Sequence, residues 1–378
     1  SVLLGSCNRE PVALKVKPDV VEKGDTARRT LLVYMMAENS LNDFATSDVS
    51  EILEAVPKVP NDCRLFVYVD DKGFPMLTQY FNLTNGEVGN SNYLPFDKDV
   101  CSSDTAVLGT LLDYILDDYP TESLDIVMWS HANGWLRAPL NTVPQRSIGI
   151  DNGKNSYSNI STGCIEVEEL AAVLKRLPTK VDRLMFDACF MQCAEVAYAL
   201  RGAAEWIIAS PAEIPGDYST LVPEFFHSGG PEAIIDVYLK AYENEYAGAV
   251  LSAVRTSGMQ HLADVTYSYV NKYFNVDRKR DYSVLFSYLP GGGYSGGIYY
   301  PCYYDMNVVM KRYLDADEYK HWREAFDGAV ACVAASPRWY SALCGRSISY
   351  DVRSGGGLSF YLPQLRAANE SLNLDFRT

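Results

Sequence analysis

The chain has 378 residues, of which 48% are hydrophobic and 21% charged, which is typical of a folded protein with a large core. Its formal net charge of −15 disfavours binding to the phosphates of nucleic acids and to anionic bilayers, so we expect no nucleic-acid partner. The nine cysteines include no CxxC pair, which argues against a zinc finger and against a disulfide framework.

The first residues resemble the end of a bacterial lipoprotein signal. Residues 2–7 read VLLGSC, and in such signals the cysteine that follows a small residue is lipidated. We therefore expect a lipid anchor on Cys7 and an exported protein, in the bacterial cell envelope or extracellular, that meets a membrane only through that anchor. No other stretch approaches the ~18 apolar residues of a transmembrane helix. Residues 1–28 are interpreted as a leader remnant followed by a polar linker.

Short apolar runs alternate with segments of helical periodicity in the next part of the chain. This alternation predicts a doubly wound, mostly parallel α/β sheet flanked by helices over residues 29–245. Beyond about residue 245 the pattern loosens, and we predict a smaller α+β C-terminal domain over 246–378 that contributes a late strand. The expected strands are 30–36, 65–69, 126–129, 184–186, 206–209 and 358–362, and the expected helices are 49–56, 106–116, 167–177 and 193–200.

Reactive side chains follow two of the apolar runs. His131 comes shortly after the run 126–129, and Cys189 comes shortly after the run 184–186. In a parallel sheet the carboxyl ends of neighbouring strands, ~4.8 Å apart, form one rim where ligands bind. A thiol and an imidazole brought together there can exchange a proton, which makes Cys189 a candidate nucleophile and His131 its acid/base partner.

Further features of Cys189 and His131 favour this chemistry. We expect Cys189 to open the helix that runs to Leu200, where the helix dipole and a nearby imidazolium would lower the pKa of the thiol. The backbone N–H groups of Cys189 and Ala132, the residue after His131, are candidates for an oxyanion hole.

Five segments of the chain carry a resemblance to a known family. They are LLVYMMAENSL at 31–41, HANGW at 131–135, FDACFM at 186–191, EVAY at 195–198 and GLSFYLP at 357–363. In these segments the chain resembles the clostripain-like cysteine peptidases, relatives of caspases, legumain and gingipains, over about residues 30–220 and again near 357–363. The resemblance implies a caspase-like fold and an endopeptidase that uses a Cys-His dyad to cleave protein or peptide substrates after Arg or Lys.

Cleavage after a basic residue requires a carboxylate in the S1 pocket. Asp187 matches the Asp-Ala-Cys position of the family, and Glu213 and Asp217 follow the next strand at the same rim. Asp187 could instead cap the following helix, and the two loop acids could be solvated. A preference for Asp or Asn at P1 would instead be that of the caspase or legumain branches.

The long connection between His131 and Cys189 is rich in turn-forming residues. Family members resemble this arrangement and are activated by a cut after a basic residue in this loop, which makes the bond between Arg146 and Ser147 our candidate for self-cleavage of a zymogen. Arg137 and Lys154 are weaker candidates. A loop that stays intact and contacts the substrate is the alternative.

Three further interpretations concern other classes of site. Ala132 stands where the family usually has glycine, and alanine tolerates a positive φ poorly. If the oxyanion hole needs a positive φ at this residue, catalysis would be impaired. The alternative function is therefore a catalytically impaired, surface-tethered binding lipoprotein of the same fold. A redox or metal site built from Cys189 and Cys193 does not fit the spacing of CxxC motifs. We expect no cofactor and no metal ligands; the acids Asp97, Asp99 and Asp104 could bind calcium, but they lack the spacing of an EF-hand.

Overall fold

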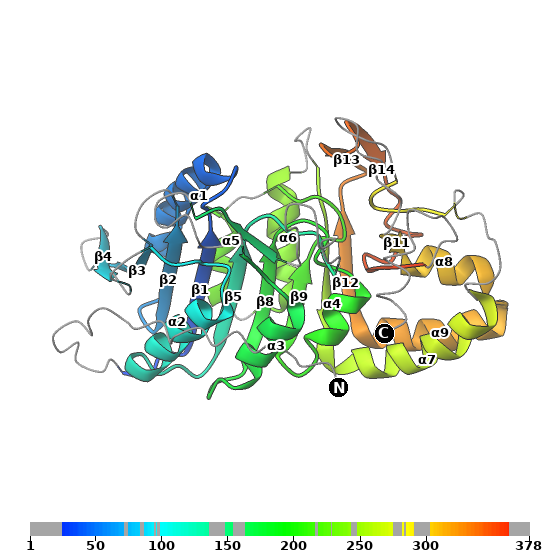
Figure 1. Ribbon diagram of the computed structural model, residues 1–378, viewed down its shortest axis with the longest axis horizontal. Helices are drawn as coiled ribbons and strands as arrows, with labels where there is room; N and C mark the ends of the chain where they lie inside the picture. The colour runs from blue at the N-terminus through cyan, green and yellow to red at the C-terminus, as the bar shows by residue number, and fades with distance from the viewer. Residues whose placement is uncertain are drawn as a thin grey trace.

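A nine-stranded sheet organises the chain, with the strand order β12-β10-β9-β8-β5-β1-β2-β3-β4 (Figure 1). None of the helices in the part of the chain that is described has the length and apolar character needed to cross a bilayer. The computed structural model describes residues 25–71, 75–83, 87–93, 96, 99–135, 148–153, 163–215, 218–227, 229–242, 248–274, 282, 285–290 and 303–362.

Five parallel strands form the centre of the sheet. β1 (Arg29–Met36) pairs with β2 (Cys63–Asp70) on one side and with β5 (Leu124–Trp129) on the other. β5 then pairs with β8 (Val181–Asp187), and β8 pairs with β9 (Ala204–Ala209). The five apolar runs expected to be buried parallel strands are these five elements, so this prediction is confirmed, and with it the doubly wound α/β class.

Antiparallel strands extend the sheet at both edges. β3 (Met76–Asn82) and β4 (Val88–Tyr93) continue it beyond β2. At the other edge, β10 (Val250–Arg255) and β12 (Val330–Ala335) continue it beyond β9. The chain after residue 245 thus contributes two strands to the same sheet.

Two layers of helices cover the two faces of the sheet. Strand β1 is apolar without interruption because both of its faces are buried. Side chains alternate between the faces of a strand, so Leu32, Tyr34 and Met36 enter one core cluster while the residues between them enter the other. Each fully buried side chain of this kind contributes roughly 1.5–3 kcal/mol. The first core includes α2 (Thr105–Asp118), α3 (Val167–Lys175) and α4 (Ala194–Ala199), and the second includes α1 (Asn42–Ala55), α5 (Leu221–Phe226) and α6 (Pro231–Tyr242).

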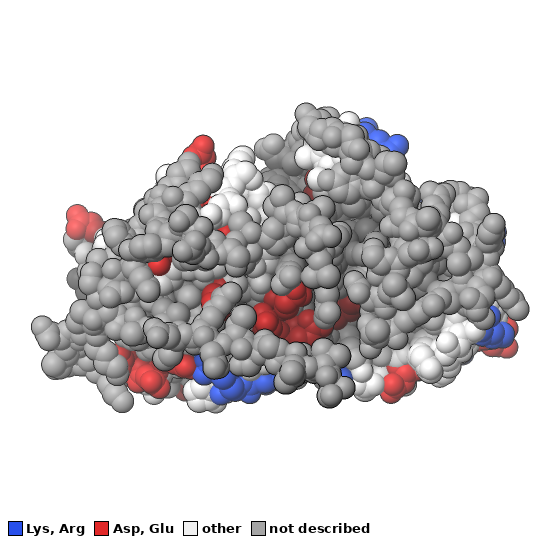
Figure 2. Space-filling model, viewed as in Figure 1, with Lys and Arg blue, Asp and Glu red and all other residues white. Residues whose placement is uncertain are grey.

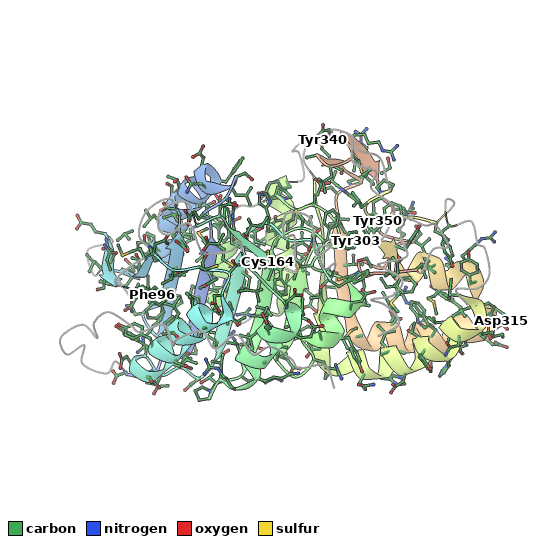
Figure 3. All side chains as sticks on the ribbon, in the orientation of Figure 1. Phe96, Cys164, Tyr303, Asp315, Tyr340 and Tyr350 are labelled. Atoms are coloured by element: carbon green, nitrogen blue, oxygen red, sulfur yellow. The ribbon has the colours of Figure 1, made fainter. Side chains whose placement is uncertain are left out.

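The later part of the chain packs beside β12 and builds a third core that is rich in aromatic rings. Tyr303 and Tyr350 of this core lie between the sheet edge and the β13–β14 hairpin (Figure 3). Phe190, which comes from the rim of the sheet, is a member of the same core. The remaining elements are α7 (Met259–Tyr273), α8 (Met306–Tyr313), α9 (Ala316–Ala329), β6 (Ile148–Asp151), β7 (Gly163–Ile165), β11 (Tyr304–Asp305), β13 (Arg338–Ser341), β14 (Arg346–Ser349), β15 (Ser359–Phe360) and the 3₁₀ turns Val56–Lys58 and Thr256–Gly258.

Candidate active site

His131 and Cys189 lie at the same rim of the sheet. β5 and β8 are parallel neighbours, and their last paired residues are Trp129 and Asp187. Each of the two reactive residues follows two positions beyond this pair, so the chain delivers both to the carboxyl edge of adjacent strands. The expectation that the two strands are neighbours is confirmed.

The imidazole of His131 is held by a residue that the sequence did not single out. Its Nε2 atom lies 2.8 Å from the hydroxyl oxygen of Ser40. Its backbone carbonyl accepts a hydrogen bond from the N–H of Gly149 at 3.0 Å. Burial lowers the pKa of His131 below its usual value of 6.5, so the ring is neutral at neutral pH. A neutral imidazole is the form that can accept a proton.

Cys189 lies in a tight turn rather than at a helix terminus. The helix α4 begins at Ala194, with Cys193 as its N-cap, so the expectation that Cys189 opens this helix is wrong. The turn intervenes because Phe190 adopts a positive φ of 62°, which a helix cannot accommodate. Cys189 and Cys193 therefore do not share a helical face.

The thiol of Cys189 is protonated in this form of the protein. Burial raises its pKa to about 12, and the nearby acids Glu213 and Asp187 act in the same direction. A hydrogen bond from the backbone of Ile214 acts against them. The lowered thiol pKa expected from a helix dipole is not what the structure gives, because the turn separates the thiol from the helix.

The turn after Cys189 is fixed by contacts from two directions. The N–H of Phe190 donates to the carbonyl of Ala212 at 2.9 Å. The ring of Phe190 stacks on Tyr303 with 4.6 Å between ring centroids and 12° between ring planes. A positive φ in a bulky residue costs of order 1–3 kcal/mol and persists where surrounding structure over-determines it. These contacts supply that constraint next to the candidate nucleophile.

The loop after His131 is fixed against the same turn. The hydroxyl of Tyr303 donates to the carbonyl oxygen of Asn133. Gly134 has a φ of +64°, and a Cβ there would lie only 2.7 Å from the carbonyl oxygen of Phe190. Glycine is thus required for the two loops to approach each other so closely.

The left-handed conformation in this loop falls on Gly134 and not on Ala132. Among the described residues other than glycine, Phe190 alone has a positive φ. Ala132 instead forms an antiparallel bridge with Ile148, the first residue of β6. The alanine that replaces the usual glycine therefore carries no backbone strain of the kind that would impair an oxyanion hole.

Two of the three candidate S1 acids lie near Cys189, and each accepts a hydrogen bond. Asp187 is buried and accepts a hydrogen bond of 2.6 Å from the hydroxyl of Tyr218. Burial raises the pKa of Asp187 to about 7, and the Tyr218 hydrogen bond opposes this rise. Glu213 accepts hydrogen bonds from the Ser341 hydroxyl and, at 3.1 Å, from the N–H of Leu343.

Two residues of the site, Ser40 and Tyr303, were not predicted from the sequence, and only one of them had a signal there. Ser40 follows β1 at the same rim as the dyad, so the rule that located His131 also points to it. Tyr303 comes from a distant segment with no motif. Seven of the positions predicted from the sequence lie outside the residues that the structure describes: Cys7, Asp97, Arg137, Arg146, Ser147, Lys154 and Asp217.

Solved structures similar to this chain are cysteine proteases. A secreted cysteine protease from Bacteroides thetaiotaomicron, in complex with an irreversible peptide inhibitor, is 27% identical with a TM-score of 0.77, and the match covers 93% of this chain and 96% of that one. An inactive zymogen protease from Parabacteroides distasonis is 26% identical with a TM-score of 0.76, over 94% of this chain and 96% of that one.

Sequence comparisons agree with these structures. Clostripain from Hathewaya histolytica is 24% identical over 257 residues, which are 61% of this chain and 48% of the relative. The chain thus spans about half the length of that relative. The model of the clostripain family matches residues 33–376. Because this match covers most of the sequence, the chain belongs to the clostripain family.

Proposed function

We propose that the protein is a cysteine endopeptidase in which Cys189 is the nucleophile and His131 is the general acid and base. The observation that carries this proposal is the register of β5 and β8, which delivers both residues to one rim at equal distances beyond the last strand pair. The cysteine proteases of similar fold support it.

Each step of the proposed reaction has a donor and an acceptor of protons. The neutral His131 takes the proton of Cys189, and the thiolate sulfur then bonds to the carbonyl carbon of the substrate. Backbone N–H groups of Cys189 and Ala132 stabilise the negative oxygen. When the C–N bond breaks, the imidazolium gives its proton to the leaving amine. Water then attacks the thioester while His131 takes its proton. The C–S bond breaks to release the acid, and the imidazolium of His131 returns the proton to the thiolate of Cys189.

The resting thiol, with a pKa of about 12, ionises only when the imidazole accepts its proton. This state fits a zymogen, and the relative from Parabacteroides distasonis is described as an inactive zymogen. The alternative, a catalytically impaired binding lipoprotein, rested on backbone strain at Ala132. Without positive φ at that residue, this argument for impairment loses its basis.

For specificity we propose cleavage after Arg or Lys. The acids near Cys189 favour a cationic P1 side chain, and the acidic surface favours basic substrates. On the face drawn in Figure 2, Asp and Glu side chains gather over α3 and α4, and α3 carries the exposed Glu168 and Glu169. Asp187, Glu213 and Asp217 are the proposed S1 acids, and a protonated Asp187 would serve less well than an ionised one.

The activity is tested with purified protein and peptide reporters that end in Arg, Lys, Asp, Asn or Leu. We expect hydrolysis of the Arg and Lys reporters alone, and its loss in Cys189→Ala and in His131→Ala. Cys332→Ala, which removes a partly buried thiol on the edge strand β12, is the matched control and should keep full activity. Hydrolysis that survives in Cys189→Ala would refute the assignment.

We also propose that the protein activates itself by cutting between Arg146 and Ser147. The described residues on the two sides of this loop contact each other. The N–H of Gly149 donates to the carbonyl of His131, and Ile148 forms a bridge with Ala132. Incubation should convert the wild type, and not Cys189→Ala, into fragments of 146 and 232 residues (378 − 146 = 232). A wild-type chain that is intact and fully active would contradict self-cleavage.

Export and a lipid anchor on Cys7 complete the proposal. The relative from Bacteroides thetaiotaomicron is described as secreted, which supports export. Cells expressing the full precursor should incorporate labelled fatty acid into the protein, and Cys7→Ser should abolish this incorporation. Equal labelling of both proteins would exclude Cys7 as the anchor.

A further inference from the structure

Two fully buried tyrosines interact with Asp187, the first of the proposed S1 acids, and only one of them forms a hydrogen bond with it. The hydroxyl of Tyr218 donates to Oδ2 of Asp187 at 2.6 Å. Tyr238 comes from α6, and its hydroxyl has no hydrogen-bond partner among the residues that the structure describes. Buried polar atoms are almost always paired, so an unpaired hydroxyl beside a proposed binding pocket indicates a partner that arrives later.

Tyr238 lies within reach of the charges of the proposed active site. Burial raises its pKa well above the usual value of 10, and among the charged groups that add to this rise Asp187 is the strongest. Cys189 acts in the same direction. Tyr218 and Tyr238 both belong to the second core, together with Met185 of β8, the strand that ends at Asp187. The Tyr238 hydroxyl is therefore in apolar surroundings, on the face of the sheet from which Tyr218 already contacts the acid.

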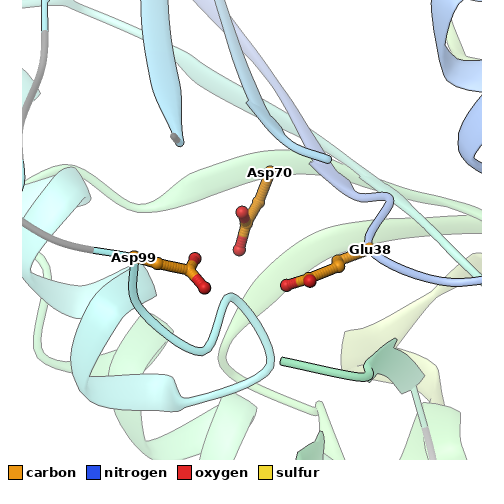
Figure 4. Close-up of side chains that lie close together, drawn as sticks. All are labelled: Glu38, Asp70 and Asp99. Carbon is orange, nitrogen blue, oxygen red and sulfur yellow. The ribbon is translucent and has the colours of Figure 1, made fainter. Parts of the chain in front are cut away.

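A second group of buried acids at the same rim shows what a tyrosine donor contributes. Glu38, Asp70 and Asp99 point toward one another, with one oxygen of each within 4.8 Å of the others (Figure 4). Burial and the charges of neighbouring carboxylates raise the pKa of Asp70 to about 9. Burial raises the pKa of Asp187 only to about 7, and the hydrogen bond from Tyr218 opposes this rise. A hydroxyl donor thus favours the ionised form of Asp187, and a second donor would act in the same direction.

An ionised Asp187 needs more than one donor if it is to bind a cation in the interior. The cost of removing an ion pair from water is offset only where further hydrogen bonds satisfy the remaining lone pairs. A carboxylate has about four lone-pair sites, and Tyr218 occupies one of them. Asp187 is 7% exposed, so a P1 side chain can reach it from the rim, while Tyr238 can supply a donor from the core side.

We propose that Tyr238 is a positioning residue for the S1 carboxylate, a role that rests on the proposed cleavage after Arg or Lys. When a P1 cation reaches Asp187, the proton of this acid leaves to the solvent, and the hydroxyl of Tyr238 donates to the ionised carboxylate beside that of Tyr218. The two donors then hold the carboxylate toward the cation. An uncharged P1 side chain does not ionise Asp187 and gains nothing from Tyr238.

The test compares the wild-type enzyme with Tyr238→Phe, which removes only the hydroxyl oxygen. Hydrolysis of the Arg reporter gives kcat and KM, and competitive inhibition by butylguanidine gives the inhibition constant of a cation in S1 alone. We expect kcat/KM to fall about tenfold, mostly through KM, and the inhibition constant to rise by a similar factor, because a hydrogen bond to a charged group is lost. The melting temperature should stay the same or rise, because the hydroxyl that is removed has no partner in the resting protein.

Tyr288→Phe is the matched control. Tyr288 is also fully buried, but its hydroxyl is already paired, since it donates to the buried Asp305 at 2.5 Å. This variant should lower the melting temperature and leave the inhibition constant of butylguanidine unchanged. Alkylation of Cys189 by iodoacetamide, followed by mass analysis of peptides, should proceed at the wild-type rate in Tyr238→Phe if only S1 is affected.

Two different failures can be told apart. If the wild type hydrolyses the Arg reporter and Tyr238→Phe keeps KM and the inhibition constant within twofold of the wild-type values, the role of Tyr238 is refuted while the proposed function stands. A slower alkylation of Cys189 in Tyr238→Phe would also overturn the role, because the defect would then lie in the dyad. A wild type that does not hydrolyse the Arg reporter would refute the proposed function, and this inference with it.

Discussion

Tyr303 connects the two loops that carry the proposed dyad, so replacing it should lower kcat/KM by more than the loss of folding stability alone explains. Its hydroxyl donates to Asn133 in the loop after His131, and its ring stacks on Phe190 beside Cys189. It is 1% exposed. Tyr303→Phe removes only the hydrogen bond and should cost about 1 kcal/mol of stability. Tyr303→Ala also removes the ring and should cost about 3–5 kcal/mol.

The catalytic effect of these two variants should differ more than their stability. Without the ring, each loop loses one of the contacts that fix it, and misplacement of reacting groups by about 1 Å can cost 10²-fold in rate. We therefore expect kcat/KM of Tyr303→Ala to fall about 100-fold, mostly in kcat, and that of Tyr303→Phe to fall only a few-fold. Urea unfolding gives the stabilities, and reporter hydrolysis at low temperature, where the variants are folded, gives the kinetics.

Tyr119→Ala is the control for this experiment. Tyr119 is 3% exposed and packs edge-on against Phe66, before β5 and so at the opposite end of the sheet. It should lose comparable stability and keep kcat/KM. If folded Tyr303→Ala hydrolyses the reporter within about twofold of the wild type, Tyr303 does not position the dyad.

Three further predictions concern the same rim. Gly134→Ala should lose activity and more stability than Gly345→Ala, because both have positive φ but a Cβ meets nothing within 4 Å at Gly345; equal losses of stability would contradict the steric argument. The raised pKa of Asp187 means that its contribution to stability is complete below its ordinary pKa of 3.8 and is lost as pH rises through about 7. Wild type should therefore lose a few kcal/mol of stability relative to Asp187→Asn between about pH 4 and pH 7 in urea unfolding, with no further loss above that range, and parallel pH profiles would refute the shift. Ser40→Ala should lower kcat/KM about tenfold with little change in KM, since one hydrogen bond orients His131, and an unchanged kcat would exclude that role.

The sequence predicted the central sheet because burial on both faces leaves a direct pattern. The run from Leu31 to Met36 has no polar position, and its side chains divide between two cores. The same reasoning located the rim and hence His131 and Cys189. These features depend on local periodicity and on the rule that parallel strands end at one edge.

Other parts of the site depend on tertiary contacts and could not be predicted. The helix begins only at Ala194 because the turn at Phe190 intervenes, and contacts with Tyr303 and Ala212 hold Phe190 at an unfavourable φ. No local sequence propensity indicates this turn.

The pairing of β5 with β8 determines how the two fragments would be held together after the proposed cut. A cut at the proposed bond would leave His131 on one polypeptide and Cys189 on the other, so each product alone would lack half of the chemistry. The cleaved enzyme would then be a heterodimer joined through hydrogen bonds in the interior of a sheet. Its refolding after denaturation would be bimolecular and its melting temperature would depend on concentration, whereas the uncut chain would refold at a rate independent of dilution.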